Sequence, residues 1–203
     1  DGAGHALTIN FNDAPLTVSD VNGYGLIEQP YSAGNNCLFH NLSGTVHDLV
    51  VHGTITTQGQ YAGSVTNHIQ GSDNADNLMI YRIYSDVNIV STYEGDGTHG
   101  GFVGVADKSS MMSNICFAGS ITSTATKNVG GIIGWCSKDT KMYNVLVVPT
   151  SISVAAGNNN IISRNPDKII DKSNIYYLNN FGTSIPDWAT QTTSEAVSGG
   201  ALA

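Results

Sequence analysis

The sequence is poor in charge, and above all in positive charge. Only 12% of its 203 residues are Asp, Glu, Lys or Arg, about half the usual share. Eight scattered Lys and Arg residues stand against 16 acidic ones, which gives a formal net charge of -8. Because there is no basic stripe, we expect no nucleic-acid partner and no binding to an anionic membrane surface. Asn, Ser, Thr and Gly must cover the surface instead, a composition that fits an extracellular β-rich protein.

Long hydrophobic runs and paired-cysteine motifs are missing as well. No stretch approaches the roughly 20 apolar residues of a membrane span, so we expect no membrane insertion. The three cysteines, Cys37, Cys116 and Cys136, form no CxxC motif, which argues against a zinc knuckle or a redox site. We expect all three to be small buried apolar residues. The alternative is a Cys116–Cys136 disulfide across neighbouring strands, and sequence alone does not decide it.

The chain opens abruptly at DGAGHALTINF, a pattern typical of a turn followed by a strand, and no signal peptide is present. We therefore expect a mature fragment or an excised domain, with other domains of a parent protein as neighbours. Helical periodicity is absent too, since no segment has a convincing apolar run at i, i+3, i+4 and i+7.

What the sequence does contain is a repeat. Similar text begins at Val46, Ile80, Met112 and Met142, and a degenerate fifth copy begins at Lys172. The starting positions 46, 80, 112, 142 and 172 differ by 34, 32, 30 and 30. Repeats of this length indicate a solenoid or a propeller, and two good strands per copy fit a solenoid better than a four-stranded blade.

Each full copy alternates apolar with small or polar residues, and a period of two indicates strands. By the same period, His47 and His52 should face opposite sides of their strand. Three copies are expected to carry a second strand, at 61–65, 100–105 and 130–135. The glycines of the repeat suit sharp corners with positive φ.

The alignment also predicts two ladders of equivalent residues, stacked about 4.8 Å apart. The inward ladder holds Leu49, Ile83, Ile115, Val145 and Ile175. The position before it holds Asp48, Arg82, Asn114, Asn144 and Asn174. We expect this second ladder at a turn, where an Asn side chain can bond the backbone of the next coil. The predicted fold is all-β: a right-handed parallel β-helix of about six coils over 1–178, with 179–203 as a C-terminal cap or linker tail.

The pattern IxNxxxxGxI, a polar stretch, GGxxG and the next xxN resembles the GLUG-type repeat of large secreted bacterial surface proteins. These include adhesin-like proteins and non-catalytic parts of some surface peptidases, and the ending resembles gut-bacterial versions. The resemblance covers residue 1 to about 195. It implies an extracellular or cell-surface adhesion or recognition module, or a stalk, with a host or dietary glycan or a protein as ligand. Arg82, Val87 and Pro149 depart from the pattern, so we expect irregular coils there.

Aromatic residues are the better functional lead. Tyr61, Tyr93, Trp135 and Tyr143 are candidates for binding sugar rings, because aromatic faces flanked by Asn and Asp suit stacking and hydrogen bonding. The alternative is that such rings fill the solenoid or cap its rim.

Two acidic loops are candidates for calcium, with Asp73 and Asp76 in one and Glu94 and Asp96 in the other. Calcium prefers six to eight oxygen ligands. Neither loop matches a full EF-hand or nonapeptide motif, so the alternative is two solvated loops and no cofactor.

Catalysis is the alternative function, since many parallel β-helix proteins are polysaccharide lyases or glycoside hydrolases. Such a site needs two carboxylates at a set separation, or a calcium and a base. No carboxylate constellation recurs along one face of the predicted solenoid. We therefore predict a non-catalytic module.

Overall fold

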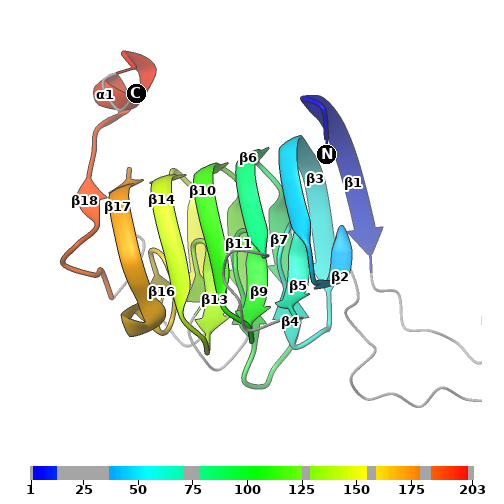
Figure 1. Ribbon diagram of the computed structural model, residues 1–203. Coiled ribbons are helices and arrows are strands. Elements are labelled where there is room, and N and C mark those ends of the chain that lie inside the picture. Colours follow the sequence, from blue (N-terminus) through cyan, green and yellow to red (C-terminus); the bar gives the residue numbers. More distant parts are fainter. Residues whose placement is uncertain are drawn as a thin grey trace, which may run out of the picture.

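The computed structural model describes residues 2–12, 37–70, 78–124, 129–154, 159–178 and 184–200. Over these ranges the chain is an all-β parallel solenoid of about four turns, so the predicted fold class is confirmed. Strands of successive coils lie side by side along one axis, from β1 at one end to β17 near the other (Figure 1). No helix in these ranges is long and apolar enough to cross a membrane.

The largest sheet has ten strands, and all its pairings are parallel. One part of it stacks β1 (His5–Asn12), β3 (Thr45–Thr57), β6 (Met79–Ser85), β10 (Ser110–Phe117), β14 (Thr140–Val147) and β17 (Ile169–Tyr177). The other part stacks the end of β3 with β7 (Asn88–Ser91), β11 (Ser120–Ser123) and β15 (Ser151–Val154).

Shorter sheets close each coil. A four-stranded sheet contains β2 (Phe39–Leu42), β5 (Thr66–Ile69), β9 (Val103–Ala106) and β13 (Ile133–Cys136). Two-stranded sheets pair β4 (Tyr61–Ala62) with β8 (Thr98–His99), and β12 (Val129–Gly130) with β16 (Asn159–Asn160).

The pairing register confirms the repeat alignment. Val46 pairs with Ile80, Ile80 with Met112, Met112 with Met142, and Met142 with Lys172. The differences in residue number between these partners, 34, 32, 30 and 30, are therefore the lengths of single coils.

The prediction of about six coils is wrong. Five long strands, β3, β6, β10, β14 and β17, bound four turns, and β1 adds a single strand beside β3 at the N-terminal end.

Inward side chains stack into apolar columns that form the core. The predicted column of Leu49, Ile83, Ile115, Val145 and Ile175 is present. Its last four members are at most 2% exposed, and Leu49 at the N-terminal end is half-buried. A second column runs through Ile55, Ile89, Ile121 and Ile152. Burying one such side chain stabilises the fold by about 1.5–3 kcal/mol, so each coil depends on its neighbours for its share.

Each predicted second strand is broken at a corner. The chain leaves β8 and enters β9 through Gly100, and Gly130, the last residue of β12, pairs with Gly100 at the equivalent place before β13. A Cβ added at Gly100 would lie 2.1 Å from the carbonyl oxygen of Val103, and one at Gly130 would lie 1.9 Å from that of Ile133. These glycines permit close backbone contact. The positive φ expected for the repeat glycines is found at Gly53, and Gly100 and Gly130 do not have it.

The departures at Val87 and Pro149 have different outcomes. On both sides of Val87, paired residues differ by 32 in residue number from the next coil, so the predicted irregularity is absent there. At Pro149 the difference from the preceding coil changes from 30 to 31. This coil therefore takes up the proline by adding one residue to the bend.

The C-terminal segment packs over the last coil. Its strand β18 (Thr190–Gln191) pairs with the end of β17, and Ile185, Trp188 and Ala189 pack against the core. The short 3-10 helix η3 (Pro166–Lys168) precedes β17, and the five-residue helix α1 (Ser194–Ser198) follows β18. Thr193 caps α1 by accepting a hydrogen bond from the Ala196 N–H, 3.2 Å away.

Candidate functional site

Five residues at the same place in successive coils have a left-handed backbone conformation. The φ angles of Asp48, Arg82, Asn114, Asn144 and Asn174 lie between 52° and 56°. Asn and Asp adopt this region more readily than other residues with a side chain. Each of them lies within a long strand, so the predicted turn is seen as a left-handed residue inside the strand, and we call these five residues the corner ladder.

One left-handed residue per coil breaks the strict alternation of the strand. The adjacent side chains of Tyr81 and Arg82 both lie outside the core, between the buried Ile80 and Ile83. The same slip places His47 and His52 on one outer face, so the prediction that they face opposite sides is wrong. A left-handed residue shifts the period-two alternation by one residue, so residues on either side of it cannot be placed by that period.

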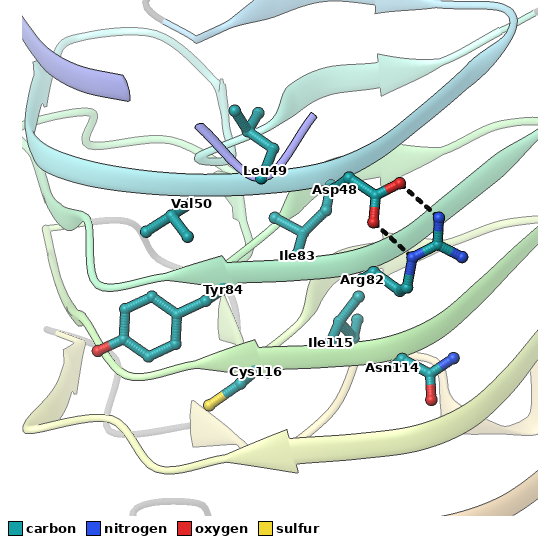
Figure 2. Close-up of a pocket in the computed structure, with 10 residues that line it drawn as sticks. Asp48, Leu49, Val50, Arg82, Ile83, Tyr84, Asn114, Ile115 and Cys116 are labelled. Atoms are coloured by element: carbon teal, nitrogen blue, oxygen red, sulfur yellow. Dashed lines mark hydrogen bonds and ion pairs between the residues drawn. The ribbon is translucent and has the colours of Figure 1, made fainter. Parts of the chain in front are cut away.

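A groove of about 380 Å³ follows the corner ladder on the outside of β3, β6 and β10. Figure 2 shows Asp48, Arg82 and Asn114 along one side of it, Val50, Tyr84 and Cys116 along the other, and Leu49, Ile83 and Ile115 between them. Ligand pockets typically have volumes of about 300–1,000 Å³. The groove is therefore large enough for a short stretch of a ligand.

The polar side of the groove begins with an ion pair. Arg82 donates from Nε to Asp48 Oδ1 at 2.5 Å and from Nη2 to Asp48 Oδ2. Hydrogen bonds from Arg82 and then from His47 hold the pKa of the Asp48 carboxyl well below its usual range. The His47 ring stacks on Tyr81, with centroids 4.7 Å apart, and Arg82 lies 4.6 Å from the centroid of the same ring. These contacts hold the side chains of Asp48 and Arg82 in place.

The polar side continues as a row of amides. Asn144 Nδ2 donates to Asn114 Oδ1 at 2.9 Å, and Asn174 Nδ2 donates to Asn144 Oδ1 at 2.8 Å. The predicted ladder is confirmed, but its partner differs from the prediction. Because the left-handed corner turns the amide outward, each Asn bonds the side chain of the neighbouring coil and not its backbone.

The other side of the groove is an apolar row two residues after the corner ladder. It contains Val50, Tyr84, Cys116, Leu146 and Tyr176, paired in register. Tyr84 is 37% exposed. Burial, followed by the nearby Asp86 carboxylate, raises the pKa of Tyr84, so its hydroxyl stays protonated at neutral pH. The sequence prediction missed this row as a site. Its signal is the regular place of the row after each Asn.

The four aromatic residues predicted as a binding site do not come together. Tyr61 lies on β4, Tyr93 in the loop before β8, Trp135 on β13 and Tyr143 on β14. All four are half-buried. They therefore form no shared platform, and their role in binding stays a prediction.

Two of these rings already have partners. The Arg164 guanidinium lies 4.4 Å from the centroid of Trp135, and the Tyr143 hydroxyl donates to Asp171 Oδ2 at 2.5 Å. A ligand that stacked on Trp135 would have to use the face that Arg164 leaves.

The predicted calcium loops are seen in part. Asp73 and Asp76 lie outside the described residues. Glu94 and Asp96 are exposed, and Asp96 Oδ1 accepts a hydrogen bond from Arg164 Nη1 at 2.5 Å. Within the described ranges, no group of three or more His, Cys, Asp or Glu side chains is placed to hold a metal ion. Calcium binding stays a prediction.

The cysteines are free thiols, so the alternative of a Cys116–Cys136 disulfide is wrong. The two lie on different sheets, Cys116 on β10 and Cys136 on β13. Cys37 and Cys136 are buried as expected, whereas Cys116 is half-buried in the apolar row. Burial raises the pKa of each thiol to about 11, so none is a reactive thiolate at neutral pH.

The fold and the groove define a β-solenoid scaffold with an outer ligand-sized groove. Among curated proteins, the chain is similar to halomucin of Haloquadratum walsbyi (strain DSM 16790 / HBSQ001), with 27% identity over 99 residues. The match covers 48% of this chain and 1% of halomucin, so it concerns a small part of that protein. No family model matches the chain, and no solved structure matches it.

Proposed function

We propose that the chain is a non-catalytic recognition module on a stalk-like scaffold in a larger extracellular or cell-surface protein. The observation that carries the proposal is the groove beside the corner ladder, where polar and apolar rows lie on a rigid stack of paired strands. The parallel solenoid and the low share of charged residues support it. The resemblance to GLUG-type repeats, with bacterial adhesin-like proteins among them, is consistent with a surface role.

Immobilised ligands test the proposal. The purified chain is applied to an array of glycans and mucins, and in parallel to fibronectin, laminin and collagen, with calcium and with a chelator. Saturable binding to one class supports recognition. Binding that needs calcium would add support for the acidic loops as cation sites, whereas no binding to any surface would contradict recognition.

A product assay tests the catalytic alternative. Each glycan that binds is incubated with the chain, and reducing ends and the ultraviolet absorbance of unsaturated lyase products are followed over time. We expect no change relative to a heat-denatured control. Steady release of product in proportion to protein concentration would contradict a non-catalytic module.

A further inference from the structure

The polar side of the groove has hydrogen-bonding capacity to spare. A side-chain amide has two N–H donors and two acceptor lone pairs. Asn114, the amide that lines the groove, accepts one hydrogen bond from Asn144, and Asn144 and Asn174 continue the row of amides beyond the lining residues. Both N–H donors and one acceptor lone pair of Asn114 are left for a ligand. A hydroxyl group both donates and accepts, so it matches such an amide.

The opposite side of the groove supplies apolar contact. Tyr84 presents an exposed ring in the middle of the row, between Val50 and Cys116 (Figure 2). Leu146 and Tyr176 continue the row beyond the residues that line the groove. Four steps of about 4.8 Å give the two rows a length of about 19 Å. A sugar ring has apolar C–H faces and polar edges, so a chain of rings can contact both rows at once.

The charges that line the groove and the net charge of the chain both disfavour acidic ligands. Among the described residues that line the groove, Arg82 alone is cationic, and both of its hydrogen bonds to Asp48 satisfy a carboxylate of the protein itself. The formal net charge of -8 would repel a polyanion further. A polyuronate would thus lose its hydration without gaining an opposite charge.

The direction of the groove disfavours a peptide strand. The rows run across the strands along the solenoid axis, and β6, β10 and β14 are hydrogen-bonded to neighbours on both edges. An extended peptide bound by strand addition needs a free edge, and the floor of the groove offers none.

We propose that the groove binds an unbranched neutral polysaccharide along the solenoid axis, with its hydroxyl groups on the amide row and its ring faces on the apolar row. This inference rests on the proposed recognition function and names its ligand class and site.

Affinity electrophoresis in native gels tests the ligand class. The gels contain mannan, dextran or mixed-linkage β-glucan as neutral polymers, and polygalacturonate or alginate as anionic ones. At least one neutral polymer should retard the chain, and the polyuronates should not. Retardation by the polyuronates alone, or by no polymer, would overturn the proposal. In the second case, the protein surfaces of the preceding experiment still test recognition separately.

Variants test the site. Tyr84→Ala should weaken binding by about tenfold or more, because it removes the exposed ring, and Tyr84→Phe should retain most of the affinity. Cys116→Trp should block the groove and also abolish binding. Phe39→Ala, at an exposed ring on β2 outside the groove, is the matched control and should bind like the wild type. Circular dichroism and melting temperature check that each variant is folded.

The opposite pattern would locate binding elsewhere. If Tyr84→Ala and Cys116→Trp bind normally while Tyr93→Ala, Tyr143→Ala or Trp135→Ala loses binding, the groove is not the site. The recognition function would then stand and this inference would fall.

Discussion

Each coil turns at two kinds of corner, and the chain solves them in opposite ways. The corner ladder uses residues with side chains in the left-handed conformation, and those side chains point to solvent or to one another. The glycine corner, at Gly100 and Gly130, has no room for even a methyl group. The difference shows that a corner tolerates side chains when they point outward, and outward side chains are those that a ligand can reach.

The largest effect is expected where the glycine corner is filled. Gly130→Ala would place a methyl group against the carbonyl oxygens of Ile133 and Ile162, at 1.9 and 2.9 Å. Backbone atoms cannot withdraw easily, so we expect the free energy of unfolding to fall by about 3 kcal/mol or more, measured by urea denaturation. Gly44→Ala is the matched control, because nothing lies within 4 Å of the place that its Cβ would occupy. Equal stability of both variants would contradict a rigid corner.

As the pH falls, we expect the glycine corner to be destabilised at a higher pH than the corner ladder. His99 is fully buried beside Gly100, with Nδ1 2.9 Å from Ser123 Oγ and Nε2 3.2 Å from the Gly59 carbonyl oxygen. Burial lowers the pKa of His99 from 6.5 to about 4. The unfolded chain therefore binds the proton first as the pH falls.

The stability from neutral His99 is complete above pH 6.5 and is lost as the pH falls toward 4. The loss is on the order of 3 kcal/mol across this window. Urea denaturation from pH 7 to 4 measures it, and His99→Gln should flatten the profile relative to the wild type. His5→Gln, on the exposed strand β1, is the matched control. Identical profiles for wild type and His99→Gln would contradict the assignment.

A smaller effect is expected within the corner ladder. Asn144→Ala removes one hydrogen bond to each neighbouring coil and places alanine at φ 53°. We expect the free energy of unfolding to fall by about 1–2 kcal/mol. Asn144→Gly loses the same hydrogen bonds but accepts the conformation, so it should be the more stable variant. If Asn144→Ala were the more stable of the two variants, the left-handed backbone would not be the reason for the loss of stability in Asn144→Ala.

The smallest effect is expected at the ion pair. Arg82→Asn replaces the charged rung by a fourth amide and removes an exposed interaction with Asp48. We expect a shift in melting temperature smaller than that of Asn144→Ala, which shrinks further at about 1 M NaCl, where charges are screened within about 3 Å. A shift that persists in high salt would mean that Arg82 acts through packing on Tyr81.

The sequence predicted the stacking register because side chains in a solenoid repeat at fixed intervals. Asn114, Asn144 and Asn174 were visible as equivalent residues, and Asn is a residue type that accepts a left-handed backbone. The buried columns followed from the same alignment. Local patterns were sufficient wherever one coil copies the next.

The remaining features depend on contacts that no local pattern contains. The breaks at Gly100 and Gly130 arise from backbone atoms of other segments, such as Gly134 N near Gly100 and Ile162 O near Gly130. The groove arises because the left-handed residue shifts the inward and outward alternation of each strand by one residue. The same shift turns Tyr84 outward. The aromatic candidates were chosen by residue type, and residue type alone does not say which face a ring occupies.

The coils that join β10 to β14 and β14 to β17 have the same length at the corner ladder, where equivalent Asn residues are 30 residues apart. Equivalent side chains of successive coils are about 4.8 Å apart along the solenoid axis. The two rows can be lengthened or shortened by one step when one such coil is added or deleted. Each added coil carries one amide and one apolar side chain at the equivalent positions.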